Sequence, residues 1–197
     1  MKTITIGVLA FHGDVIEHIH ALEQSAKNLH FTVRVLPVRT KKDAASLDAL
    51  IIPGGESTTL YKLCKREDMW GNLIKIKFIF GTCAGAIMLA KTVHHKTADQ
   101  QTLARMDITI DRNAYGRQSE SFEKDITTSL GTLRAIFIRA PRIEKVGKSV
   151  TVLAKEGSEI IACEETRGAY YNLATCFHPE LTSTLFHEYF LKKVAGR

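Results

Sequence analysis

A cysteine between two glycines is the residue of this sequence with the clearest chemical potential. Cys83 stands in Gly81-Thr82-Cys83-Ala84-Gly85, after the apolar run 76–80 and before the helix-like segment 84–92. Strand, sharp turn and helix form the context of a nucleophile elbow, where small neighbours let the backbone turn tightly. A helix that begins after the cysteine turns its positive end toward the sulfur and favours the thiolate. These residues predict a thiol nucleophile; a buried structural cysteine at a helix start is the alternative.

A thiol nucleophile needs a base and a group that orients the base. Among the eight histidines, His178 stands out because Phe177-His178-Pro179-Glu180 closes an apolar strand. Residues two apart in extended backbone point to the same side, so we expect His178 and Glu180 to share one face. The carboxylate would then set the imidazole tautomer and stabilise its charged form. The three residues predict a Cys-His-Glu triad, although the tripeptide alone is also typical of a turn that starts a helix.

The other histidines are assigned to structural or solvated positions, with one exception. His18 and His20 lie two apart on a predicted helix and so do not face each other, and His187 belongs to the last helix. The pair 94–95 sits in a polar loop, where no carboxylate or cysteine cluster completes a metal site. We therefore expect no metal. His12 differs because its loop should lie near the active-site edge.

Strand and helix patterns alternate along the first half of the chain and predict an α/β fold with a mainly parallel or mixed central sheet flanked by helices. Strands are expected at 4–10, 31–38, 47–52 and 76–80, and helices at 15–29 (with Asp14 as N-cap), 57–64, 69–74 and 84–92. The second half predicts strands at 106–110, 132–138, 150–154, 159–163 and 170–177, a helix at 183–194, and an exposed loop at 94–105.

Three distinctive loops come after predicted strands, at residues 12–13, 53–57 and Cys83. Open α/β sheets place ligands at the carboxyl ends of their strands. We therefore expect these loops to meet at one edge of the sheet and to form the active site.

Composition limits the class of protein. The 197 residues (22.0 kDa, 45% hydrophobic) suit one domain over 1–197. The net charge of +6 is a reason to consider nucleic-acid binding, but the basic residues are scattered, so we do not expect it. The sequence has no run of 18 apolar residues, so we do not expect a membrane-spanning helix or a membrane partner either. The N-terminus predicts a strand rather than a signal peptide, and the four cysteines form no C-x-x-C pair. Reduced thiols and a cytoplasmic location are expected.

Several segments resemble the class I, triad-type glutamine amidotransferases, and in particular the glutaminase subunits of pyridoxal 5′-phosphate synthases. The similarity covers about residues 4 to 190 and is carried by 53–59, 81–85, 112–118, 137–141 and 177–182. It implies a flavodoxin-like fold and hydrolysis of L-glutamine to L-glutamate and ammonia, without a cofactor. It also implies a partner, the synthase subunit, which uses the ammonia in a hetero-oligomeric complex to build pyridoxal 5′-phosphate.

The resemblance also assigns roles. Cys83 would be the nucleophile, His178 the base and Glu180 its orienter. The residues that would surround bound glutamine are Gly55, Glu56, Ser57, Arg112, Ile138 and Arg139. The chemistry further needs oxyanion donors, for which the backbone N–H groups of Ala84 and of Gly54 or Gly55 are candidates. Either arginine could bind the substrate α-carboxylate, and Glu56 or backbone carbonyls its α-ammonium.

Two departures from the family pattern stand out. His12 occupies a position where glutamine is expected, and because histidine titrates near neutral pH, activation by the partner could be altered. The loop 93–105 lacks the expected glycine-containing apolar pattern, which is expected to change the surface without touching the triad. We also hypothesise that docking of the partner switches the Gly54–Gly55 loop.

Other interpretations remain open at this point. A glutaminase subunit of another synthase, such as imidazole-glycerol-phosphate synthase, is disfavoured by the segments 55–59 and 112–118. A non-catalytic amidotransferase-like module is disfavoured by the intact Cys83, His178 and Glu180. A cysteine hydrolase of similar architecture would lack the His-x-Glu pair, and a nucleic-acid-binding role would show a steep salt dependence.

Overall fold

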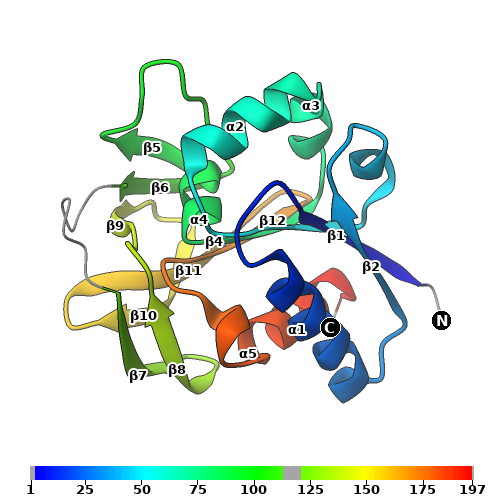
Figure 1. The fold of residues 1–197 in the computed structure, drawn as a ribbon. Helices are drawn as coiled ribbons and strands as arrows, with labels where there is room; N and C mark the ends of the chain where they lie inside the picture. The colour runs from blue at the N-terminus through cyan, green and yellow to red at the C-terminus, as the bar shows by residue number, and fades with distance from the viewer. Residues whose placement is uncertain (1–2, 113–120, 197) are drawn as a thin grey trace.

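A parallel sheet forms the half of the molecule that carries the N-terminus (Figure 1). The computed structural model describes residues 3–112 and 121–196. In spatial order the parallel strands are β2 (Val33–Val38), β1 (Ile4–Leu9), β3 (Ala49–Ile52), β4 (Phe78–Thr82) and β12 (Tyr170–Thr175). Their carboxyl ends all lie at one edge, as parallel pairing requires.

Antiparallel strands continue the sheet beyond β12. They are β11 (Glu159–Arg167), β10 (Val150–Glu156), β7 (Phe122–Thr128) and β8 (Gly131–Phe137). A branch leaves β11 through β9 (Arg142–Val146), β6 (Met106–Asp111) and β5 (Ala90–His94), and β5 pairs with β6 in parallel. The predicted mixed α/β sheet is therefore confirmed.

Helices cover both faces of the parallel strands. α1 (Val15–Leu29) and α5 (Leu185–Val194) pack against each other on one face. α2 (Ser57–Arg66), α3 (Trp70–Leu73) and α4 (Ala84–Leu89) occupy the other, and two 3-10 turns span Asp43–Ser46 and Pro179–Leu181 (Figure 1). α1 buries His18, Leu22 and Ala26, a spacing of four residues that aligns one helical face with the core.

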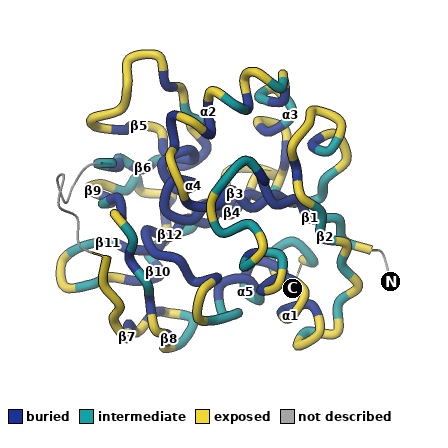
Figure 2. The backbone as a smooth tube through the Cα atoms, in the orientation of Figure 1, coloured by how far each residue is buried: buried dark blue, intermediate teal, exposed yellow. Residues whose placement is uncertain are grey.

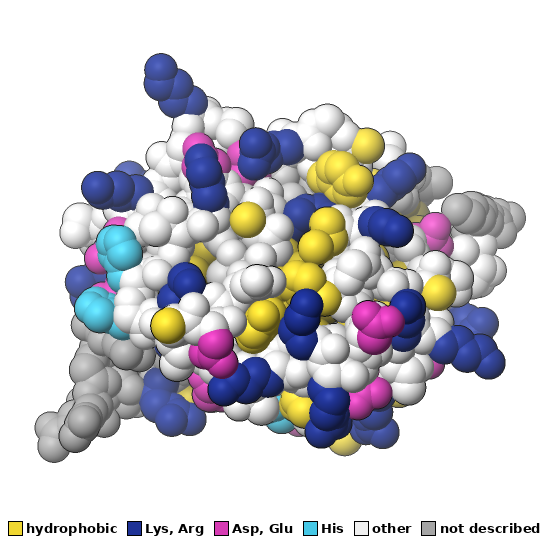
Figure 3. Space-filling model, turned by 90° about the horizontal axis from the view of Figure 1, so that it is seen from above, with side chains coloured by type: hydrophobic (Ala, Val, Ile, Leu, Met, Phe, Trp, Pro, Cys, Tyr) yellow, Lys and Arg dark blue, Asp and Glu magenta, His cyan; other side chains and the backbone are white. Residues whose placement is uncertain are grey.

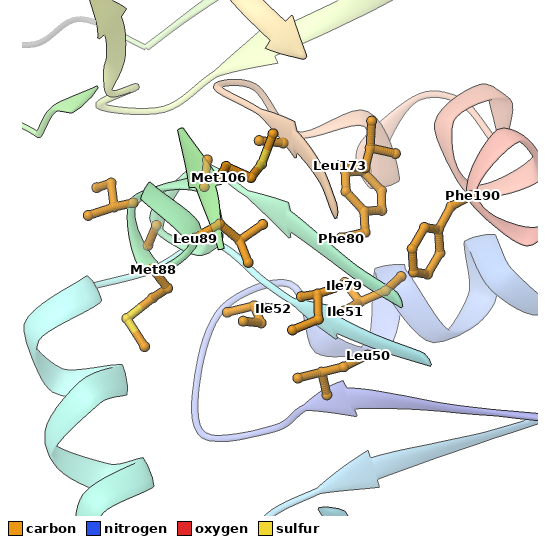
Figure 4. Packing of buried hydrophobic residues seen from close by; sticks show 14 of the residues in the cluster. Leu50, Ile51, Ile52, Ile79, Phe80, Met88, Leu89, Met106, Leu173 and Phe190 are labelled. Carbon is orange, nitrogen blue, oxygen red and sulfur yellow. The ribbon is translucent and has the colours of Figure 1, made fainter. Parts of the chain in front are cut away.

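The central strands are apolar because both of their faces are covered. Leu50, Ile51 and Ile52 of β3 and Ile79 and Phe80 of β4 are fully buried (Figure 4). Burying each such side chain contributes roughly 1.5–3 kcal/mol. Figure 2 shows this burial along the centre of the sheet, with exposed residues in the loops around it. The rigid core thus ends directly beneath the loops that come after β3 and β4.

Some predicted elements were wrong. The helix expected over 84–92 ends at Leu89, because Ala90 is extended and begins β5. β7 and β9 were not predicted, and β7 exposes most of its residues, so it lacks the apolar alternation that would reveal it. The expected exposed loop at 94–105 buries Gln100, Leu103 and Arg105.

The surface carries both signs of charge. On the face seen in Figure 3, Lys and Arg side chains are dispersed, and acidic side chains lie between them. Such a mixture is typical of a solvated surface. Among the described residues, no helix has the length and apolar character needed to cross a lipid bilayer.

Candidate active site

The carboxyl edge of the parallel sheet brings the predicted site residues together. β4 and β12 are parallel neighbours with Thr82 opposite Thr175, so Cys83 after β4 and His178 after β12 emerge side by side. β3 lies on the other side of β4 and delivers the 53–57 loop to the same place. The expectation that these loops meet at one edge is confirmed by the cavity that they line.

Cys83 occupies a strained turn between β4 and α4. Its φ of 50° and ψ of −105° are rare for a residue with a side chain, and such conformations cost on the order of 1–3 kcal/mol. A Cβ on Gly81 would overlap the backbone of Gly85, and one on Gly85 would overlap the carbonyl oxygen of Ile52. Only glycine fits these two positions, which fixes the cysteine at the end of the sheet. Its Sγ lies 3.8 Å from the carbonyl oxygen of Ile138.

His178 and Glu180 form a buried pair beside the cysteine. His178 Nδ1 lies 2.8 Å from Glu180 Oε1, and both side chains are almost inaccessible. We expected an extended backbone to place His178 and Glu180 on one face, but that prediction was wrong. Pro179 begins a 3-10 turn, and this turn brings the carboxylate back to the ring. Proline suits that position because its φ is preset for a helical turn.

The charges of this pair support each other. Burial opposes a charge on His178, but hydrogen bonds with Cys83 and Glu180 outweigh burial and raise the pKa of His178 to about 10. Burial likewise opposes ionisation of Glu180, yet His18 and His178 hold the pKa of Glu180 below its usual range. The arrangement favours an imidazolium next to a carboxylate.

Asp14 approaches the same nitrogen from the loop before α1. Its Oδ2 lies 2.9 Å from His178 Nδ1. Asp14 is the N-cap residue of α1, as predicted, but its side chain makes no capping hydrogen bond. Potential ligand atoms of Asp14, His178 and Glu180 lie within 4.8 Å of one another. His178 Nδ1 is hydrogen-bonded to Glu180 and lies within ion-pair distance of Asp14, so the ring stands between two carboxylates.

Two histidines that sequence analysis assigned to structural positions lie behind the pair. His18 Nε2 is 3.3 Å from Glu180 Oε1 and 3.2 Å from Thr82 Oγ1, and its Nδ1 is 2.9 Å from His187 Nε2. Both rings are fully buried. Burial and the neighbouring His18 lower the pKa of His187 to about 3, so His187 is neutral. The place of His18 on a predicted helix gave no sign of these partners.

A cavity of about 340 Å³ opens in front of Cys83. It is lined by Gly13, Asp14, Gly55, Glu56, Ser57, Cys83, Ala84, Ile87, Arg112, Ile138, Arg139 and His178. Every predicted glutamine-binding residue therefore borders one space. Two predicted residues lie outside the lining: Glu180 stands behind His178, and a Cβ on Gly54 would overlap the His178 ring.

A polar network holds one wall of the cavity. Arg112 donates to Glu56 Oε1 at 2.7 Å, to Thr58 Oγ1 at 2.8 Å and to Gln100 Oε1 at 3.0 Å. Glu56 also accepts from the Thr59 hydroxyl and from the backbone N–H groups that start α2. Burial opposes its charge, but the hydrogen bonds from Thr59, the α2 backbone and Arg112 lower the pKa of Glu56 to about 2. The 113–118 part of the family motif lies outside the described residues.

Gln100 is a residue of this wall that sequence analysis missed. Its amide donates to Ser57 Oγ at 3.0 Å, and its carbonyl accepts from Thr58 and Arg112. The expectation of an exposed loop at 94–105 is wrong for this residue, which is buried. Its hydrogen bonds reach the cavity wall and none of them involves a triad residue. A single polar residue in a polar loop carries no periodic signal, so only the network reveals it.

His12 lies over the glycines that come after β3. A Cβ on Gly55, whose φ is 118°, would overlap the His12 ring, and a Cβ on Gly13 would overlap the carbonyl oxygen of Gly54. His12 Nε2 is buried and makes no hydrogen bond within the described residues. The loop with the unexpected histidine thus touches the loop that carries the candidate oxyanion donors.

Known proteins resemble this chain in sequence and fold. The model of the SNO glutamine amidotransferase family matches residues 8–196. Proteins named pyridoxal 5′-phosphate synthase subunit PdxT are similar: that of Methanospirillum hungatei is 44% identical over 97% of each chain, and that of Thermotoga maritima is 43% identical over 96% of this chain and 98% of its own. A crystal structure of a glutamine amidotransferase superposes with a TM-score of 0.79 at 38% identity, covering 98% of this chain and 99% of the other. The chain therefore belongs to the SNO glutamine amidotransferase family.

Proposed function

We propose that this chain, acting as one amidotransferase domain over residues 1–197, is the glutaminase subunit of a pyridoxal 5′-phosphate synthase. It hydrolyses L-glutamine to L-glutamate and ammonia through Cys83, His178 and Glu180. The observation that supports this most is the buried His178–Glu180 pair, 2.8 Å apart, beside a cysteine on a strained elbow. Family membership and the names of the relatives point to the same reaction and complex.

Each step of the reaction has a residue suited to it. The Cys83 thiolate attacks the side-chain amide carbon, and the negative charge moves to the amide oxygen. Backbone N–H groups of Ala84 and of Gly54 or Gly55 are the proposed donors to that oxygen; loss of one donor typically costs ~10²–10³ in rate. His178 then gives a proton to the leaving ammonia. Water, deprotonated by His178, cleaves the thioester and releases glutamate.

The cavity wall suits the amino-acid end of the substrate. Arg112 and Arg139 both line the cavity and offer guanidinium groups to an α-carboxylate. The Glu56 carboxylate is held ionised by Arg112 and by the first turn of α2, which suits an α-ammonium group. Gln100 holds Ser57, Thr58 and Arg112 in place. We therefore assign substrate binding to Gly55, Glu56, Ser57, Arg112, Ile138 and Arg139.

A separate synthase subunit must receive ammonia before it meets water, since ammonium is not a nucleophile. This requires a tight complex, and activation on docking would prevent wasteful hydrolysis. The contact of His12 with Gly55 supports a role for that loop in activation, because a partner that moves His12 also frees the candidate oxyanion donors. Full glutaminase activity in the isolated chain would contradict this gating.

The test is glutamine hydrolysis by the purified chain, with and without the synthase subunit, with Cys83→Ala as the blank. We expect ammonia release that rises on addition of the synthase and vanishes in the variant. Absence of release in both conditions, with a synthase that is competent on free ammonia, would reject the proposed pairing. Activity retained in Cys83→Ala would reject the nucleophile.

A further inference from the structure

We propose that His18 is a positioning residue of the triad, which holds Glu180 in the place from which it orients His178. The inference rests on the proposed function, because it assigns a task within the same reaction. The groups that carry it are all buried: His18 and His187 are fully inaccessible, and Glu180 is 7% exposed.

Glu180 is held by few groups. Glu180 Oε1 lies 2.8 Å from His178 Nδ1 and 3.3 Å from His18 Nε2. Glu180 Oε2 has no hydrogen-bond partner among the described residues. Without His18, the carboxylate would keep one hydrogen bond and could turn about its side-chain bonds. A buried carboxylate with an unmet lone pair also gains a proton more readily.

A competing acceptor makes this placement important. Asp14 Oδ2 lies 2.9 Å from the same His178 nitrogen, and its side chain is 32% exposed. If Glu180 turned or became neutral, the imidazole would follow Asp14 and rotate with the loop that carries it. His18 therefore keeps His178 bound to the rigid, buried carboxylate.

The neighbours of His18 fix the hydrogen on one of its ring nitrogens. A carboxylate only accepts hydrogen bonds, so the His18 Nε2 that faces Glu180 carries the hydrogen and donates. The other ring nitrogen, Nδ1, lies 2.9 Å from Nε2 of the neutral His187. His187 Nδ1 has no hydrogen-bond partner in the part of the chain that the structure describes. The ring of His18 is therefore held at both nitrogens.

The contact with Thr82 connects His18 to the strand end before Cys83 as well as to Glu180. Thr82 directly precedes Cys83, and its Oγ1 lies 3.2 Å from His18 Nε2. One imidazole thus touches both the strand end that carries the nucleophile and the carboxylate that orients the base. The titratable groups that face Glu180 are His178 beside it, His18 from α1, His187 from α5 and, across the His178 ring, Asp14.

The test compares variants at position 18 in the complex with the synthase subunit. His18→Leu removes the contacts with Glu180, Thr82 and His187 and is expected to lower kcat for glutamine about 10-fold to 100-fold with KM little changed. The acid limb of its rate profile should move to higher pH, because Glu180 loses a donor that favours its charge. His20→Leu, an exposed histidine on the same helix, should behave as wild type.

Two amides separate positioning from packing. His18→Gln places an N–H near the Nε2 position and should recover most of the rate, whereas His18→Asn places its amide near Nδ1, toward His187, and should not. Equal impairment of both variants with an unshifted pH profile would mean that His18 only fills space. This comparison stands even where His18→Leu fails to fold.

A second readout is independent of glutaminase activity. The rate of Cys83 alkylation by iodoacetamide, measured against pH, reports thiolate formation next to His178. His18→Asn should shift this profile and His18→Gln should not; identical profiles would overturn the inference. If the wild-type complex showed no glutaminase activity, or if Cys83→Ala kept that activity, the proposed function would be refuted. The alkylation result on His18 would remain valid in both cases.

Discussion

At the scale of the residue, the site depends on side chains that differ from others of their kind only in their surroundings. All four cysteines are free and buried, but only Cys83 borders the cavity in the described structure. Burial raises the pKa of Cys64 and of Cys163 to about 12 and that of Cys176 well above its usual value. Reactivity should therefore be confined to one thiol.

We expect iodoacetamide at pH 8 to modify Cys83 alone in the native protein. A thiol with a pKa of about 12 is ionised to only about one part in 10⁴ at that pH, so the other three react slowly. Peptide mass spectrometry after timed labelling measures the site. Cys83→Ala should take up no label on the same timescale; labelling of Cys64, Cys163 or Cys176 at the rate of Cys83 would contradict the prediction.

Gly85→Ala should lower the free energy of unfolding by about 1–3 kcal/mol, because the new methyl group meets the Ile52 carbonyl oxygen. Gly71→Ala is the matched control: Gly71 also lies in a helix, and a Cβ there meets nothing within 4 Å. That change should be neutral or stabilising by about 0.5–1 kcal/mol. Urea unfolding measures both, and an equal effect of the two substitutions would refute the elbow packing.

At the scale of the element, the loops and helix starts at the strand ends build the site, and the strands themselves only support them. α2 begins at the loop after β3, and Glu56 caps its first turn while it pairs with Arg112 after β6. The 95–105 segment between β5 and β6 supplies Gln100 to the same wall. The cavity wall thus joins three elements that are distant in sequence through one network.

Gln100→Ala should raise KM for glutamine about tenfold with a smaller change in kcat. The truncation removes one hydrogen bond each from Ser57, Thr58 and Arg112, whereas Arg112 keeps its hydrogen bonds to Glu56 and Thr58. The loss loosens the wall but does not touch the triad. Gln101→Ala, an exposed neighbour, is the control. Steady-state glutaminase kinetics in the complex decide; unchanged KM would show that the network does not position substrate.

At the scale of the whole molecule, the sheet and two distant helices meet at the triad. α1 and α5 pack together beneath the carboxyl edge and bring His18 and His187 to Glu180. The protonation of His178 is therefore linked to global folding. Its pKa is about 10 in the folded protein and 6.5 when unperturbed, so the folded state binds the proton more tightly.

This linkage predicts a pH-dependent stability. Because the pKa of His178 is higher in the folded protein, protonation of His178 stabilises the fold. This stabilisation is fully present below pH 6.5 and is lost as the pH rises toward 10, with a slope of at most about 1.4 kcal/mol per pH unit. The stability difference between wild type and His178→Gln should shrink over that window. Urea unfolding from pH 6 to 10 measures it, with His20→Gln as control. A difference that stays constant with pH would refute a protonated His178.

Much of this molecule could be predicted from local pattern. The alternation of strands and helices over residues 4–89 was evident from apolar periodicity, and the candidate nucleophile and its base were evident from glycine spacing and from a His-Pro-Glu tripeptide. These signals lie within a few residues of each other, so the sequence alone displays them. β7 was not predicted because its exposed, charged residues lack such a pattern.

The tertiary structure alone decided which further residues support the site. His18 and His187 are 169 positions apart, and Gln100 is 43 positions from Ser57. Such partners meet only because α1 packs on α5 and because the loop before β6 folds onto α2. A sequence determines the chemistry that each residue can perform and the element to which it belongs; the packing of elements determines which of these residues reach one another.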